Sequence, residues 1–299
     1  MCDLISTDEI FPSYYHKFKC IADKCRHNCC IGWEIDIDCD TLDLYNSIDG
    51  EMGDKIRKNI VGDEPHFALK ENGRCPFLNE SGLCDIIIEL GDGALSDICY
   101  LHPRFSNFYP SFTETGLGLS CEEAARIILS EEEKTVINIP DSISLTEEEK
   151  NFFKKREEIL AVLQKREKSI SERFLCLLDT KNIFPYDLLE KYYSLERLSE
   201  DWTDLLDSLK GYSFDEKIFL KFPIVFEQMA VYFIIRHMWD MGYEKAIKFS
   251  YISTYFIGSL CQRRKEQNGF VTIEDIIDIS RMYSAEIEYS TENIGILLN

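Results

Sequence analysis

The sequence predicts a mainly α-helical protein in which a small, irregular, cysteine-rich metal-binding N-terminal region packs on a C-terminal helical bundle. Ten of the twelve cysteines lie within the first 121 of the 299 residues, where short elements and glycines predominate. After residue 145 the apolar residues recur at intervals of three and four, the period of an amphipathic helix. Acidic residues at 131–133, followed by Pro140, separate the cysteine-rich region from the helical region.

Three segments follow from these observations. We predict a cysteine-rich metal or iron–sulfur region at 1–130, a linker at 131–144 and a helical bundle at 145–299. Thr146 and Glu149 have the spacing of a capping box, which opens the first helix of the bundle. Helices are predicted at about 146–168, 170–179, 186–198, 201–210, 214–221, 223–241, 243–264 and 272–289.

The cysteine-rich region is expected to contain shorter elements. Residues 32–38 alternate polar and apolar side chains, which predicts a short strand. Asp40 is expected to cap a helix at 41–60. The segment Cys75–Cys84 predicts two extended pieces around a Glu-Ser-Gly turn. The acidic residues that follow Cys121 favour the start of another short helix.

The net charge of −21 is spread along the chain, with −11 in residues 1–121 and −10 in the remainder. Such a protein repels phosphate backbones, so we expect no nucleic-acid partner, whereas lysine-rich proteins would be attracted. The N-terminal residues lack the pattern of a signal peptide, and no stretch is long and apolar enough to span a membrane. We therefore predict no membrane association and a cytoplasmic location.

The cysteines are informative because thiols stay reduced in the cytoplasm, which favours metal binding over disulfides. Zinc takes four ligands, with sulfur at about 2.3 Å, and a four-iron cluster takes up to four thiolates. Either metal site is compatible with the sequence, and His27 or His102 could replace a thiolate. The candidate ligands, enough for two sites or for one site with spare thiols, are Cys20, Cys25, Cys29, Cys30, Cys75, Cys84, Cys99 and Cys121.

The cysteine spacing differs from two common patterns. It is not the paired Cys-x2-Cys of zinc ribbons, and Gly32 stands where a Cys-x3-Cys-x2-Cys triplet that begins at Cys25 would have its third cysteine. Adjacent Cys29 and Cys30 cannot both face one ion without a tight bend, so one of them serves another ion or packs. The remaining cysteines are predicted to be ordinary thiols, with the last two packed within helices: Cys2, Cys39, Cys176 and Cys261.

Four blocks around these cysteines form a specific combination. The first, Phe18–Asp38, contains Cys-Arg-His-Asn-Cys-Cys-Ile-Gly-Trp, and the second is Cys75–Cys84 with Cys-Pro-Phe-Leu. The third, Leu95–Arg104, and the fourth, Leu119–Ala125, each contain one further cysteine. In this order the blocks resemble the flagellin lysine-N-methylase family, and the cysteines also resemble a broader group of zinc- or iron-chelating proteins. The chain is short for the family, and Glu122 stands where a proline is expected.

The resemblance implies a protein-lysine N-methyltransferase that moves methyl groups from S-adenosylmethionine to flagellin lysines. It also implies an iron–sulfur cluster, of the 4Fe–4S type, held by the matching cysteines, with zinc as the alternative metal. The alternative function is a non-catalytic zinc- or iron–sulfur-binding protein with a structural, sensing or cluster-carrying role. A brown chromophore would separate iron–sulfur from zinc, and methyl groups on flagellin would separate the enzyme from the binding protein.

The sequence assigns neither a catalytic base nor a cofactor-binding residue. Gly91-Asp92-Gly93 lacks the third glycine of a dinucleotide fingerprint, so S-adenosylmethionine needs an unusual site, and an open iron of the cluster is one hypothesis. Arg236 and His237, flanked by apolar residues in a predicted helix, either face a site in the bundle or form structural ion pairs. Glu227 is one candidate partner for Arg236.

Overall fold

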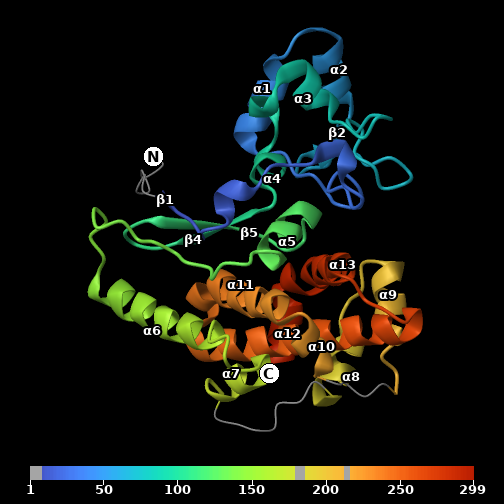
Figure 1. Ribbon diagram of the computed structural model, residues 1–299. Coiled ribbons are helices and arrows are strands. Elements are labelled where there is room, and N and C mark those ends of the chain that lie inside the picture. The colour runs from blue at the N-terminus through green and yellow to red at the C-terminus, as the bar shows by residue number, and fades with distance from the viewer. Residues whose placement is uncertain (1–8, 179–185, 212–215) are drawn as a thin grey trace. The chain divides into compact units, whose positions relative to one another are not determined.

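The computed structural model describes residues 9–178, 186–211 and 216–299 (Figure 1). The described residues are 57% helix and 8% strand, which confirms the mainly α prediction. Its residues form two compact units: unit 2 is Lys19–Arg104, and unit 1 combines the N-terminal residues to Phe18 with Phe105–Asn299. The predicted linker at 131–144 lies within unit 1 and contains no helix or strand, and the predicted domain boundaries stay a prediction.

Unit 2 contains short elements joined by irregular chain. Its apolar core is small and includes Tyr45, Phe67 and Phe77, whose rings stack or tilt against one another. The elements are η2 (Ala22–Lys24), α1 (Cys39–Ser47), α2 (Gly50–Lys58), β2 (Ile60–Val61), β3 (His66–Phe67), α3 (Asp85–Leu90), η3 (Asp92–Ala94) and α4 (Asp97–Leu101).

Two predictions for unit 2 were wrong in detail. The helix predicted at 41–60 is two helices, because Gly50 adopts a φ of 85° that an α-helix cannot continue through. Its N-cap is Asp38 rather than Asp40, and the Asp38 carboxylate accepts a hydrogen bond from Thr41 N–H at 2.8 Å. The strand predicted at 32–38 is reduced to one isolated bridge, between Asp36 and His66, because the partner strand β3 has only two residues.

Unit 1 contains a three-stranded sheet made of β1 (Glu9–Ile10), β4 (Arg104–Phe108) and β5 (Thr113–Leu117). The strand β5 lies in the middle and pairs in parallel with β1, so that Ile10 is opposite Glu114. Every residue of β5 is buried, although the strand carries threonine and glutamate. A buried strand with polar side chains needs internal partners for them, and these are described below.

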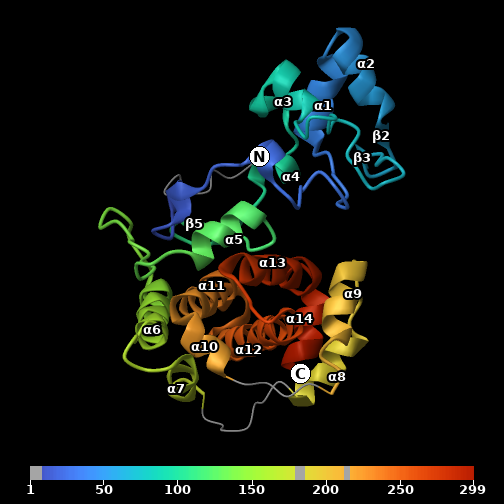
Figure 2. The ribbon, with the colours of Figure 1, turned by 45° about the vertical axis from the view of Figure 1, so that its right-hand side comes forward.

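The helices of unit 1 form the bundle that the sequence predicts. Figure 2 shows α11 and α12 side by side at its centre, as their contacts also require. Gly242, with a φ of 77°, separates these two helices. The elements are η1 (Tyr15–Lys17), α5 (Glu122–Leu129), α6 (Glu147–Leu163), α7 (Ile170–Leu175), α8 (Tyr186–Ser194), α9 (Glu200–Asp207), α10 (Lys217–Lys221), α11 (Pro223–Met241), α12 (Tyr243–Asn268), α13 (Ile273–Tyr283), η4 (Ser284–Glu288) and α14 (Thr291–Leu298).

Local sequence signals predicted most of these helices. The capping boxes at Thr146 and Thr272 are present, and Cys261 is buried as expected. Cys176, also expected to pack, is instead exposed. The last residue of the helix predicted at 170–179 and the first two residues of the helix predicted at 214–221 lie outside the described residues. Cys2 also lies outside them.

The helix predicted at 272–289 changes its winding before it ends. After α13 the chain forms the π-helical turn η4, and α14 follows as a separate helix that the sequence did not predict. A π-turn is rare and often occurs at functional sites. No helix in the described ranges is both long and apolar enough to cross a membrane.

Gly116 of β5 is predicted to be intolerant of any side chain. A Cβ added there would lie 2.3 Å from the Phe105 ring, so Gly116→Ala should lower the free energy of unfolding by about 1–3 kcal/mol. The matched control is Gly295→Ala in α14, where no atom lies within 4 Å of the added Cβ. There alanine should stabilise the helix by about 0.5–1 kcal/mol. Equal urea midpoints for the two variants would contradict this packing.

Candidate functional site

Backbone pairing in unit 2 gathers cysteines from distant stretches of sequence. Cys75 N–H donates to the carbonyl of Cys30 at 2.8 Å, which places these two residues side by side. An isolated bridge between Leu78 and Cys84 returns the chain to the same region. Cys99 joins from α4, and all four cysteines belong to one apolar cluster. The sequence therefore identified thiols that the fold brings together.

The thiols of this region act on one another electrostatically. A hydrogen bond from Cys30 lowers the pKa of Cys29 to about 7 and raises the pKa of Cys30 itself. Burial raises the pKa of Cys75, and it raises the pKa of Cys99 to about 11. Negative charge on Cys75 or Cys84 raises the pKa of both Cys30 and Cys99 further. A bound cation would relieve such repulsion and favour the thiolates.

These five residues supply donor atoms suited to zinc or to an iron–sulfur cluster. Within the ranges that the structure describes, no three Cys, His, Asp or Glu side chains are positioned to hold an ion together. The donor atoms are thiols, which thiophilic metals prefer, and the residues that carry them are neighbours. Metal binding would require their side chains to rotate toward one centre. We refer to Cys29, Cys30, Cys75, Cys84 and Cys99 as the thiol cluster.

The other predicted ligands occupy different surroundings. Cys20 is exposed, and half-buried Cys25 donates from its Sγ to the His27 carbonyl at 3.4 Å. Burial and the neighbouring Arg104 lower the pKa of His102 to about 4, so its imidazole is neutral. Cys121 belongs to unit 1, where it directly precedes α5.

Unit 1 contains a buried polar network centred on the carboxylate of Glu288, in η4. Arg236 Nε and His237 Nε2 donate to its Oε1 at 3.0 and 2.7 Å. Ser284 Oγ donates to Oε2 at 2.6 Å, and Tyr232 O–H contacts both carboxylate oxygens. Burial alone would raise the pKa of Glu288, but Arg236 and His237 outweigh it and lower that pKa. The carboxylate is therefore charged and fully satisfied at neutral pH.

Arg236 is held between two aromatic rings. Its guanidinium carbon lies 4.9 Å from the centroid of Phe105 and 4.8 Å from that of Tyr289. Burial lowers the pKa of His237, and Glu288 offsets only part of this effect, so the imidazole stays neutral beside the charged arginine. The Tyr289 hydroxyl also accepts a hydrogen bond from Ser120 at 3.1 Å. This arrangement holds the positive charge of Arg236 at a defined place that is largely shielded from water.

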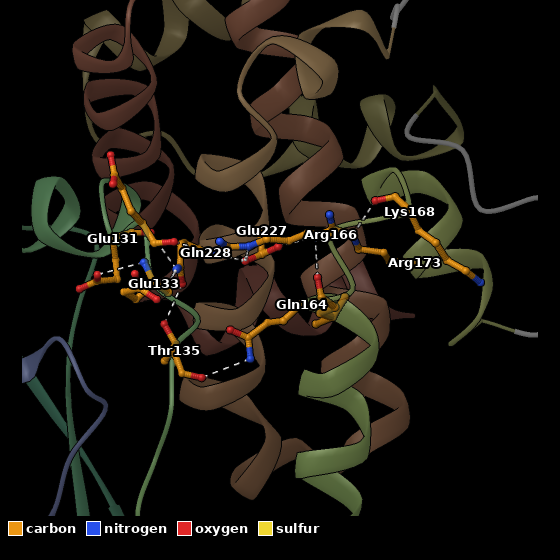
Figure 3. A network of polar contacts seen from close by, with 11 residues as sticks. Glu131, Glu133, Thr135, Gln164, Arg166, Lys168, Arg173, Glu227 and Gln228 are labelled. Atoms are coloured by element: carbon orange, nitrogen blue, oxygen red, sulfur yellow. Dashed lines mark hydrogen bonds and ion pairs between the residues drawn. The ribbon is translucent and has the colours of Figure 1, made fainter.

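A second network secures the segment between α5 and α6 (Figure 3). Glu227 accepts from Arg166 Nε at 2.9 Å and from Arg173 Nη1 at 2.7 Å. Its neighbour Gln228 donates to the carbonyls of Glu131 and Glu133 at 2.9 and 2.6 Å. These contacts satisfy backbone groups of an irregular segment, so we assign the network a structural role.

The structure decides how Arg236 is paired. The candidate partner Glu227 binds Arg166 and Arg173 instead, and Arg236 pairs with Glu288. Sequence reasoning noted Arg236 and His237 but missed Glu288 as their partner. The sequence signal for this pairing was weak: an apolar predicted helix that contains Arg236, and a separate acidic segment near residue 288.

Comparison with known proteins places the chain in a family. It is 30% identical over 148 residues to the lysine-N-methylase of Salmonella typhimurium, which is 46% of this chain and 34% of that protein. It is 32% identical over 174 residues to the flagellar biosynthetic protein FliU of Salmonella muenchen, which is 54% of this chain and 93% of FliU. The chain belongs to the flagellin lysine-N-methylase family.

Membership of the flagellin lysine-N-methylase family confirms the resemblance found in the sequence. The lysine-N-methylase of Salmonella choleraesuis matches to the same extent, 30% over 148 residues. The chain spans about a third of the length of the lysine-N-methylases that it matches. No family model matches the chain. The search of solved structures likewise found no match.

We predict that Glu288→Gln destabilises unit 1 by about 3–5 kcal/mol at neutral pH, because it leaves Arg236 buried without its counter-charge. Since the folded state lowers the Glu288 pKa, its contribution is present above the unfolded value of about 4.3 and is lost as pH falls through the folded value. Urea unfolding of the variant and the wild type should therefore converge in acid.

The control is Glu292→Gln, an exposed carboxylate near η4. It should change the free energy of unfolding by less than about 0.5 kcal/mol. A Glu288→Gln variant as stable as this control, or a difference that grows in acid, would refute the assigned charge state.

Proposed function

We propose that this chain is a protein-lysine N-methyltransferase that transfers methyl groups from S-adenosylmethionine to flagellin lysines. The observation that carries the proposal is the similarity to proteins named lysine-N-methylase, together with the match to nearly all of a protein named for flagellar biosynthesis. The net charge of −21 supports a lysine-bearing substrate, because an acidic surface attracts it. We place the reaction in the cytoplasm, where the thiols stay reduced.

The chemistry requires a neutral lysine amine. Its nitrogen attacks the methyl carbon of the donor, the carbon–sulfur bond breaks, and S-adenosylhomocysteine leaves, while the new ammonium releases a proton. Lysine is protonated at neutral pH, with a reference pKa of about 10.4. A site must therefore lower that pKa by excluding water or by placing a cation nearby. Buried Arg236, with neutral His237 beside it, supports such an environment in unit 1.

We further propose that the thiol cluster holds a 4Fe–4S cluster, with zinc as the alternative, and that Cys20 and Cys25 of the same unit contribute further ligands. For Cys121, in unit 1, a role as a metal ligand stays a prediction. The support is the mutual influence of the five thiols and the apolar surroundings that Cys30, Cys75, Cys84 and Cys99 share. When bound, an iron–sulfur cluster supplies electron transfer or an open iron coordination site. The residues of the thiol cluster would hold it and exclude water from it.

Metal analysis tests the thiol cluster. We expect the protein, purified without oxygen, to contain iron and sulfide or else zinc. Cys75→Ser and Cys99→Ser should each lower that content several-fold, because a lost thiolate weakens the site. Cys176→Ser is the matched control, since this exposed thiol lies in unit 1, outside the thiol cluster. A wild-type protein without metal, or an equal loss in the control, would overturn the proposal.

A methylation assay tests the enzyme itself. Anaerobically purified protein is incubated with recombinant flagellin and S-adenosylmethionine, and the flagellin peptides are analysed by mass spectrometry. We expect methyl-lysine in the flagellin that depends on both the donor and the folded protein. A metal-loaded, folded protein that leaves flagellin unmodified would refute the proposed function and would favour the non-catalytic metal-binding role.

A further inference from the structure

Eight buried side-chain polar atoms among the described residues of unit 1 have no hydrogen-bond partner, and three of these belong to residues that interact electrostatically. These three are the Tyr14 hydroxyl, Glu114 Oε1 and Arg236 Nη1. Tyr14 is 1% exposed and Glu114 fully buried, and the Arg236 side chain is 10% exposed. An orphaned buried polar group costs about 1–3 kcal/mol, so three such groups on residues that act on one another call for an explanation.

Two of the three residues, Glu114 and Arg236, lie over one face of the sheet. Side chains alternate along a strand, so Glu114 and Gly116 of β5 share a face. The Phe105 ring lies over Gly116, where an added Cβ would be 2.3 Å away. The Arg236 guanidinium in turn lies over Phe105, at 4.9 Å. Arg236 thus stacks over the face of β5 that carries Glu114.

Asn107 joins the two charged residues by direct contacts. Its Nδ2 donates to Glu114 Oε2 at 3.2 Å and to the carbonyl of Ile235, the residue before Arg236, at 3.1 Å. Tyr14 lies in the field of both, since burial and Glu114 raise its pKa whereas Arg236 lowers it. The three unpartnered atoms are therefore a hydroxyl, a negatively charged hydrogen-bond acceptor (Glu114 Oε1) and a positively charged hydrogen-bond donor (Arg236 Nη1).

The charges of this neighbourhood already balance. Arg156 Nη1 pairs with Glu114 Oε2 at 2.8 Å, and Glu288 pairs with Arg236, so a bound anion or cation alone would leave a buried charge uncompensated. A zwitterion adds no net charge. Its ammonium suits Glu114 Oε1, and its carboxylate suits the free edge of Arg236. The ring of Tyr289 stacks on the Arg236 guanidinium at 4.8 Å, and Tyr289 is 46% exposed, so a residue that covers Arg236 itself reaches solvent.

We propose that Tyr14, Glu114 and Arg236 bind a zwitterionic α-amino-acid group. This inference rests on the proposed function where it names the ligand, which is the methionine end of S-adenosylmethionine. The Arg236 guanidinium binds the carboxylate, Glu114 binds the ammonium, and the Tyr14 hydroxyl hydrogen-bonds to either group. The Phe105 and Tyr289 rings fix the plane of the guanidinium.

Calorimetric titration of the full, anaerobically purified chain tests the site with two probes. S-adenosylhomocysteine carries the amino-acid group, and 5′-methylthioadenosine lacks it. We expect the wild type to bind the first at least about tenfold more tightly. In Arg236→Gln and Tyr14→Phe this advantage should fall several-fold, whereas affinity for 5′-methylthioadenosine should not change. Tyr192→Phe is the matched control, a buried tyrosine hydroxyl that bonds to Tyr283 at 3.1 Å.

Stability separates a ligand site from a structural one. Tyr14→Phe removes an orphaned hydroxyl, so the urea midpoint of the ligand-free variant should equal or exceed that of the wild type. Tyr192→Phe should lower the midpoint and keep the preference for S-adenosylhomocysteine. Tyr14→Phe therefore remains an informative variant if Arg236→Gln does not fold.

The outcomes distinguish this inference from the proposed function. A wild type that prefers S-adenosylhomocysteine but leaves flagellin unmodified would refute the function and leave the site standing. A wild type that methylates flagellin while Tyr14→Phe and Arg236→Gln retain the full preference would refute the site alone. A wild type that binds both probes equally, or neither, would also overturn the site.

Discussion

The buried carboxylate of Glu288 is the constraint on which the organisation of unit 1 depends. It accepts hydrogen bonds from Arg236, His237, Tyr232 and Ser284, and thereby ties η4 to α11. The Tyr232 hydroxyl also accepts a hydrogen bond from Leu119 N–H at 3.2 Å, which extends the network to the segment after β5. Removing a charge from water costs several kcal/mol, and only a complete set of partners offsets that cost. The π-turn places Glu288 where it can meet all of them.

The two units carry different chemical resources. In unit 2 the thiolates repel one another, and a bound cation would relieve that repulsion. In unit 1 the buried Arg236 has an Nη1 group without a hydrogen-bond partner among the described residues. Cys121 lies in unit 1 directly after Ser120, whose hydroxyl bonds to the Tyr289 that covers Arg236. The proposed methyl transfer needs a binding place for the donor and a lowered lysine pKa, and we propose that the neighbourhood of Arg236 supplies the first by charge and the second by excluding water.

Local rules predicted the parts of the fold that depend on neighbours in sequence. The capping box at Thr146 and the apolar period of α11 identified their helices because both signals act within a few residues. The break at Gly50 was missed, since the apolar pattern continues across it. The sequence predicted eight cysteine ligands, and the fold brings five of them into one neighbourhood; their approach depends on pairing between Cys30 and Cys75, which spacing cannot reveal. The pairing of Arg236 with Glu288 depends likewise on tertiary packing.

The central claim is that Arg236, which Glu288 holds in place, binds the carboxylate of an amino-acid ligand. The double variant Arg236→Met with Glu288→Gln removes both charges and leaves an amide whose oxygen accepts from His237 and Tyr232 and whose NH2 group donates to Ser284 Oγ. Replacement of a buried ion pair by uncharged groups is often neutral, so this variant should unfold at a urea concentration closer to that of the wild type than Glu288→Gln alone. It should also lose the preference for S-adenosylhomocysteine over 5′-methylthioadenosine. A stable double variant that keeps the preference would contradict the claim.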